Sequence, residues 1–110
     1  MQLAHLNILA IGRNAEVMQV LERLLNAPEK WSGTGVTTED EAIAEINAKP
    51  YHLVLLCAGM TNDEEQQLKE RLLQVNPAII FIRHQGGGSG LLNSEIMAAL
   101  DKHQITITEE

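Results

Sequence analysis

Three short, almost continuous apolar runs constrain the fold of this chain more than any other feature of its sequence. They are residues 6–11, 53–58 and 78–82. Runs of this length that are apolar at nearly every position are typical of strands buried on both faces of a parallel sheet. Segments with helical spacing of apolar residues lie between them, so the sequence predicts strands and helices in alternation.

Caps and apolar spacing predict four helices between and after these runs. The expected N-caps are, in chain order, Asn14, Thr38, Thr61 and either Asn93 or Ser94. The first three helices are expected to end at Pro28, Pro50 and Pro77. The expected core stripes include Val17, Val20, Leu21, Leu24 and Leu25 in the first helix and Leu68, Leu72, Leu73 and Val75 in the third.

Two weaker strand signals complete the pattern. Residues 31–38 are rich in Gly and Thr and predict an edge strand, and residues 105–108 alternate like another edge strand. Alternating strands and helices predict a parallel sheet with right-handed crossovers. We therefore expect one α/β domain over residues 1–110, a three-layer, doubly wound, parallel five-stranded sheet of order 2-1-3-4-5.

Charge and cysteine content exclude several classes of partner. The formal net charge of −7 disfavours binding to nucleic acid and to anionic membrane surfaces. Two acidic clusters, residues 39–41 and 63–65, lie where helices should begin and fit the positive end of a helix dipole. Cys57 is the single cysteine, so no internal disulfide can form, and neither a signal peptide nor a membrane span is predicted. A reducing cytoplasm is the expected location.

The third strand region carries a resemblance to a known family. The chain resembles the response-regulator receiver domain, the CheY-like type of flavodoxin-like fold, in the segment Tyr51-His52-Leu53-Val54-Leu55-Leu56-Cys57-Ala58-Gly59-Met60. The segment Asn76-Pro77-Ala78-Ile79-Ile80-Phe81-Ile82 and the order of elements are similar too, over roughly residues 4–108. The resemblance implies a receiver fold and a role in signal transduction.

The same resemblance implies that the phosphorylation chemistry of receivers is lost. Receivers carry a carboxylate pair after the first strand, where this chain has Ile11-Gly12-Arg13-Asn14, and a phosphoacceptor Asp where this chain has Cys57. They place Ser or Thr at the end of the fourth strand, where this chain reads Arg83-His84, and Lys at the end of the fifth, where residues 105–110 hold none. The chain is therefore expected to be a degenerate pseudo-receiver that is not phosphorylated.

The candidate site is the sheet edge at which the strands end, since ligands of open parallel sheets bind there. Arg13, Cys57, Arg83 and His84 are expected at this edge and would form a cationic rim around a thiol. Such a rim suits a small anion or a thiolate of lowered pKa. The loop Gly86, Gly87, Gly88, Ser89, Gly90 could add backbone N–H groups to an anion site.

Plainer interpretations of the same residues remain open. An inert core residue is the favoured interpretation of Cys57 and a flexible connector that of the glycine loop, and Arg13 and Arg83 can be solvated or paired with Glu. The histidines show no metal-ligand spacing, so no metal and no cofactor are predicted.

Two functions follow as hypotheses. The first is a non-catalytic regulatory or protein-interaction module; the second is a small-anion, nucleotide or redox-responsive domain that uses Cys57 and the Gly86–Gly90 loop. No acid, base or metal set is visible, so an enzyme is not expected. The chain ends after the fifth predicted strand, so the last helix of a receiver is expected to be missing. An uncovered sheet face predicts a homodimer through that face, or else a protein partner that covers it.

Overall fold

The computed structural model describes residues 2–57, 59–84 and 89–107. The elements are, in chain order, β1 (Gln2–Leu3), β2 (Leu6–Ile11), α1 (Ala15–Leu25), β3 (Trp31–Val36), α2 (Glu39–Ala48), β4 (Leu53–Leu56), α3 (Asn62–Val75), β5 (Ile80–Arg83), α4 (Ser89–Lys102) and β6 (Thr106–Ile107). In these residues, no helix is long and apolar enough to cross a membrane.

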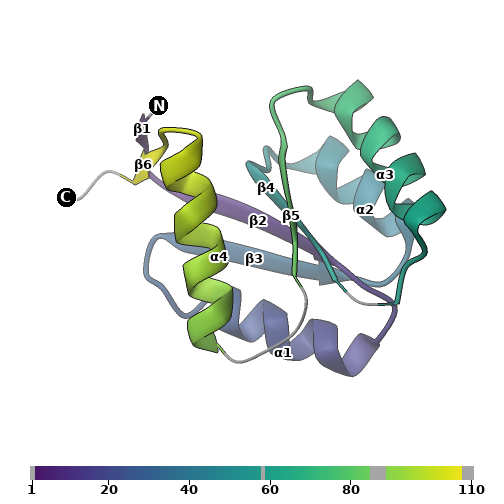
Figure 1. Cartoon of the computed structure of the whole chain (residues 1–110), viewed down its shortest axis with the longest axis horizontal. Coiled ribbons are helices and arrows are strands. Elements are labelled where there is room, and N and C mark those ends of the chain that lie inside the picture. Colours follow the sequence, from purple (N-terminus) through teal and green to yellow (C-terminus); the bar gives the residue numbers. More distant parts are fainter. Residues whose placement is uncertain (1, 58, 85–88, 108–110) are drawn as a thin grey trace.

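The three apolar runs form three adjacent strands, β2, β4 and β5, of a parallel sheet (Figure 1). Its order is β3-β2-β4-β5, which confirms the predicted order for the first four predicted strands. Ile8 in β2 lies between Gly33 of β3 and Leu53 of β4. Both central strands, β2 and β4, are buried almost throughout, as their continuous apolar sequences require.

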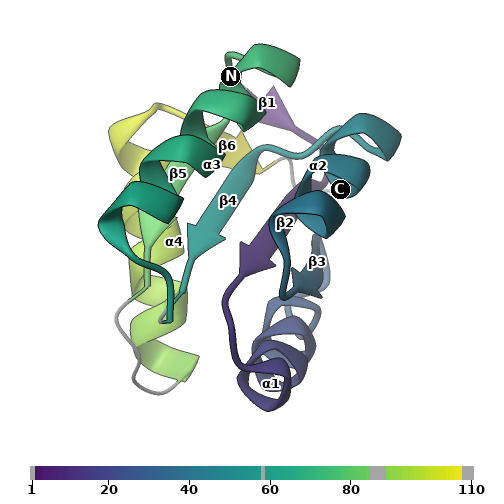
Figure 2. The same cartoon turned by 90° about the vertical axis from the view of Figure 1, so that its right-hand side faces the viewer.

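Helices cover both faces of this sheet, which confirms the three-layer, doubly wound architecture (Figures 1 and 2). Helices α2 and α3 bury residues such as Ile46, Leu68 and Leu72 in one cluster with Leu9 and Val54. The opposite face carries a second cluster that includes residues of α1 and α4.

Within the described residues no helix follows the last strand, β6, as predicted, but α4 packs on the face that the missing helix was expected to leave bare. Its Leu92, Ile96 and Leu100 pack into the same cluster as Met18 and Leu21 of α1. Helix α4 therefore covers the face that was expected to be bare, and the reason for a homodimer through that face is removed. The right-handed crossover rule applies when the strand after a helix returns to the same sheet. The strand after α4 does not pair with β5, so this rule did not determine the face of the sheet on which α4 packs.

The fifth predicted strand also lies elsewhere. Residues Thr106–Ile107 form β6, which pairs in parallel with β1 in a separate two-stranded sheet. After α4 the chain turns through Gln104, whose φ is 56°, and Ile105 is buried in the cluster of α1 and α4. Burial of Ile105 holds this end of the chain beside β1, so β5 is an edge strand of the four-stranded sheet.

Helix details differ from the expectation in three of the helices. The buried face of α1 is centred on Met18, Leu21 and Leu25, and the predicted core residues Val17 and Val20 are 47% and 49% exposed. In α3, Leu73 and Val75 are likewise exposed, because the apolar stripe extends past the buried face. Helix α4 begins at Ser89, so the two predicted caps near residue 93 lie inside it. The caps Asn14, Thr38 and Thr61 are confirmed.

Candidate functional site

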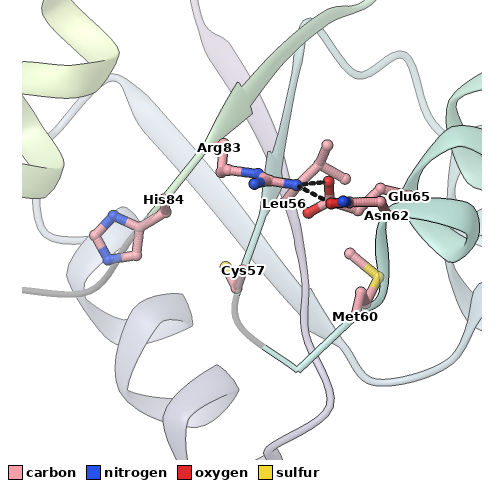
Figure 3. A pocket seen from close by; sticks show the side chains of 7 residues that line it. All are labelled: Leu56, Cys57, Met60, Asn62, Glu65, Arg83 and His84. Carbon is pink, nitrogen blue, oxygen red and sulfur yellow. Dashed lines mark hydrogen bonds and ion pairs between the residues drawn. The ribbon is translucent and has the colours of Figure 1, made fainter.

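The carboxyl ends of β4 and β5 enclose a small pocket of about 190 Å³ (Figure 3). Its lining is formed by Leu56, Cys57, Met60, Asn62, Glu65, Arg83 and His84. The Cys57 N–H donates to the carbonyl of Ile11 at 2.8 Å, and the His84 N–H donates to that of Leu56 at 2.9 Å. The structure thus brings together three of the predicted site residues, Cys57, Arg83 and His84, as the strand ends require.

Arg83 is held by helix α3. Its guanidinium forms an ion pair with Glu65 and donates to Oδ1 of Asn62 at 3.3 Å. Glu65 is buried, and Figure 3 shows the Arg83 side chain directed toward this carboxylate and away from Cys57. The positive charge of Arg83 is therefore neutralised by a neighbouring helix.

His84 is held in the same way by helix α4, on the other side of the sheet. Its Nδ1 lies 2.5 Å from Oε1 of Glu95, and the His84 side chain is buried. Figure 3 shows the imidazole and the Arg83 guanidinium pointing in opposite directions. Two consecutive residues at the end of β5 thus connect the strand to helices on both faces.

Arg13 follows β2 and lines a neighbouring hollow that it shares with Cys57 and Gly59. It forms an ion pair with Glu64 and donates to the carbonyl of Thr37 at 3.0 Å. The chain passes close to it, since a Cβ on Gly59 would lie 2.8 Å from the Arg13 Cβ, and Gly59 has a φ of +100°. Arg13 is therefore fixed against the loop after β4.

The residues of the cationic rim expected from the sequence are all engaged with carboxylates. Arg13, Arg83 and His84 each contact a carboxylate of the chain itself, respectively Glu64, Glu65 and Glu95. This arrangement favours the alternative in which the arginines are paired with Glu. Sequence analysis assigned Glu64 and Glu65 to the helix dipole and missed these long-range contacts, for which spacing along the chain offers no signal.

The environment of Cys57 is that of a core residue. The side chain is 4% exposed, and Sγ lies 3.9 Å from the carbonyl of Leu55. Burial, with a smaller effect from the charge of Glu95, raises the pKa of the Cys57 thiol to about 12. A reactive thiolate needs a lowered pKa, so the geometry supports the inert-core interpretation.

Two further expectations concern the surroundings of this pocket. The predicted contributors Gly86, Gly87 and Gly88 lie outside the described residues. Across residues 2–57, 59–84 and 89–107, no group of three or more His, Cys, Asp or Glu side chains is placed to hold a metal ion.

Comparison with known proteins identifies the fold. No protein-family model and no curated protein matches the chain. Several solved structures do, among them a CheY-like response regulator receiver domain protein from Methanospirillum hungatei JF-1. It has a TM-score of 0.75 and 16% identity, covering 91% of this chain and 97% of that one.

Two other similar structures carry the same fold. One is a two-component transcriptional regulator AraC from Clostridium phytofermentans, with a TM-score of 0.66 and 15% identity over 90% of this chain and 97% of that one. The other is the signal receiver domain of an HD domain-containing protein from Pseudomonas fluorescens Pf-5, with a TM-score of 0.63 and 19% identity over 94% and 79%. The chain therefore has the receiver fold, as the resemblance around Cys57 implied.

Proposed function

We propose that this domain is a non-catalytic regulatory module that acts by binding protein and is not phosphorylated. One observation carries the proposal. At the strand ends of a receiver fold, the chain has a buried thiol, Cys57; the nearby carboxylates Glu64 and Glu65 are paired with arginines, and Glu95 contacts the His84 imidazole.

Phosphoryl transfer to a receiver requires free oxygen ligands for a divalent cation and an ionised acceptor, and two features of this pocket argue against both. A divalent cation such as Mg²⁺ is bound by carboxylate and other oxygens that are free to coordinate it. The acceptor must be a nucleophile that is ionised at neutral pH, whereas the pKa of the Cys57 thiol is about 12. These features support a fold that is retained for binding without its chemistry.

The second hypothesis, a small-anion or redox-responsive site, receives less support from the same geometry. An anion at the pocket would have to compete with Glu65 for Arg83 and with Glu95 for His84. A redox role would need a Cys57 thiolate, which burial disfavours.

The test is incubation of the chain with Mg²⁺ and acetyl phosphate, followed by intact mass measurement. A phosphorylatable receiver domain treated in parallel provides the positive control. We expect no phosphoryl adduct on this chain. An adduct that hydroxylamine removes would overturn the proposal, because it would identify an acyl phosphate on a carboxylate.

A further inference from the structure

The outer edge of β5 presents backbone groups that have no strand to pair with. In the described part of the chain, β4 is the only strand hydrogen-bonded to β5. The N–H groups of Ile80 and His84 donate toward β4, to His52 at 3.1 Å and to Leu56 at 2.9 Å. Alternate residues of a strand point their backbone groups to opposite sides, so those of Phe81 and Arg83 face outward.

The side chains of β5 are also incompletely covered. Ile80, Phe81 and Ile82 are each partly exposed, whereas all four residues of the adjacent strand β4 are buried. Phe81 packs against the cluster of α2 and α3, and Ile80 and Ile82 pack against the cluster of α1 and α4. The apolar side chains of this edge therefore lie on both faces of the sheet, and Figure 2 shows β5 between α3 and α4. Exposed apolar edge strands are sites of strand addition.

We propose that a second copy of this chain pairs with β5 in antiparallel orientation, about a two-fold axis at Phe81. In this register the outward N–H and C=O of Phe81 exchange hydrogen bonds with those of Phe81 in the second copy. The N–H of Arg83 then faces the carbonyl of Ile79 in the second copy, and the reverse contact follows by symmetry. The two sheets would join into one continuous sheet.

The side chains of β5 match themselves in this register. The two Phe81 rings lie side by side on the face covered by α3, and Ile80 lies opposite Ile82 of the second copy on the face covered by α4. Aromatic and β-branched cross-strand pairs are among those that stabilise antiparallel sheets.

Charge favours the same register. Arg83 is the charged residue of β5 and lies at its carboxyl end, so the two-fold axis keeps the two Arg83 side chains at opposite ends of the paired strands. Each keeps its ion pair with Glu65 of its own chain, so the register brings no unpaired like charges together.

The dimer goes beyond the proposed function, because it depends on the edge of the sheet and not on the chemistry at Cys57. Phosphorylation of the chain would overturn the proposed function and leave the dimer intact. Loss of the dimer would leave the phosphorylation result unchanged.

Backbone hydrogen exchange of the unmodified chain tests the pairing, with sedimentation of the same samples. We expect the mass to rise with concentration toward twice 12.1 kDa. The Phe81 and Arg83 amides should become protected in step with that rise. The amides of Ile80 and His84, which donate to β4, serve as internal controls and should be protected at all concentrations. A monomer up to millimolar concentration, or a dimer whose Phe81 amide stays unprotected, would overturn the proposal.

A pair of variants tests the surface independently. Phe81→Lys places a charge at the two-fold axis and should weaken association by about tenfold or more. Val20→Lys makes the same kind of change at an exposed apolar residue of α1, away from β5, and should leave association unchanged. Circular dichroism checks that each variant is folded; if Phe81→Lys unfolds, the exchange experiment decides. Association that Phe81→Lys leaves intact, or that Val20→Lys abolishes, contradicts the proposed edge.

Discussion

The strand-end pocket and the outer edge of β5 lie only a few residues apart, but the polar groups at the pocket are paired within the chain and those at the edge face outward. At the pocket, Arg83 and His84 are each paired with a carboxylate from a neighbouring helix. At the edge, the backbone of Phe81 faces away from β4, and its side chain is partly exposed. The comparison teaches that charged side chains are engaged within the chain at the pocket, whereas backbone groups of β5 have no strand partner at the edge in the described residues, and this difference is why the proposed binding surface is the edge.

A second comparison shows that an edge of this sheet can be closed. Strand β3 is the opposite edge, and helix α1 covers its outward backbone groups with side chains. Asn26 accepts from the Gly33 N–H at 3.0 Å and donates to the Gly33 carbonyl at 2.8 Å, and Glu22 accepts from the Gly35 N–H at 3.1 Å. Natural sheets commonly protect their edges against pairing, and β3 follows that rule.

The largest effect is expected at the pocket. Arg83→Met leaves Glu65 without its cation, and the Glu65 side chain is only 9% exposed. Because Arg83 itself is half-exposed, we expect the free energy of unfolding to fall by about 2 kcal/mol, less than for a fully buried pair. Arg71→Met is the matched control: Arg71 pairs with the more exposed Glu39 at 3.0 Å, so its loss should cost less than about 1 kcal/mol. Urea denaturation measures both, and equal losses would show that Glu65 does not depend on Arg83.

The next effect concerns the closed edge. Asn26→Ala removes both hydrogen bonds to Gly33 and should lower the free energy of unfolding by about 1–2 kcal/mol. It should also make β3 available for pairing, so concentration-dependent association should increase. Asn47→Ala removes an exposed side-chain bond to the carbonyl of Ile43 within α2 and serves as the control, with a change of less than about 0.5 kcal/mol. An Asn26→Ala variant as stable as the parent chain would mean that the β3 edge needs no cover.

A smaller effect is expected from alkaline pH. The folded chain keeps the Cys57 proton up to a pKa of about 12, whereas the unfolded chain loses it near the ordinary value of 9. Stability from this group is therefore complete below pH 9 and is lost as pH rises toward 12. Between pH 9 and 10 the loss should be about 1 kcal/mol, measured by urea denaturation. Cys57→Ala should be flatter over this range, and an equally steep variant would assign the dependence to another group.

The smallest change in stability is expected from Lys69, whose side chain lies over the Phe81 ring at the edge strand β5. The Nζ of Lys69 lies 6.0 Å from the centre of the Phe81 ring. Lys69→Met removes this contact and should change the free energy of unfolding by about 0.5 kcal/mol or less. Lys49→Met, which removes an exposed pair with Glu45 within α2, should change it equally little. A loss of several kcal/mol in Lys69→Met alone would mean that Lys69 closes the edge of β5.

Sequence reasoning succeeded where burial alone decides the structure. The segments 6–11 and 53–56 form central strands because a continuous apolar run has no other stable place in an α/β domain. Asn14 and Thr61 cap their helices because capping is a local interaction. The position of Cys57 beyond the carboxyl end of this strand was also anticipated, although β4 itself ends at Leu56, before the apolar run does.

The parts that could not be predicted depend on contacts between distant segments. The side of the sheet on which α4 packs, and the pairing of β6 with β1, follow from burial of Leu92, Ile96 and Ile105, which spacing alone does not reveal. The carboxylates that neutralise the candidate site come from other elements, and Glu65 was indistinguishable in sequence from an ordinary helix-start acid.

Amide spectra of the isotope-labelled chain test the central comparison in one experiment. Adding Mg²⁺ with beryllofluoride probes the pocket, and dilution of the same sample probes the edge. We predict that the amides of Arg13 and Cys57 do not shift on addition, and that those of Phe81 and Arg83 shift on dilution. Shifts at Arg13 and Cys57 that require both reagents, with Phe81 unchanged on dilution, would contradict the account, because they would place binding in the pocket and leave the edge without a partner.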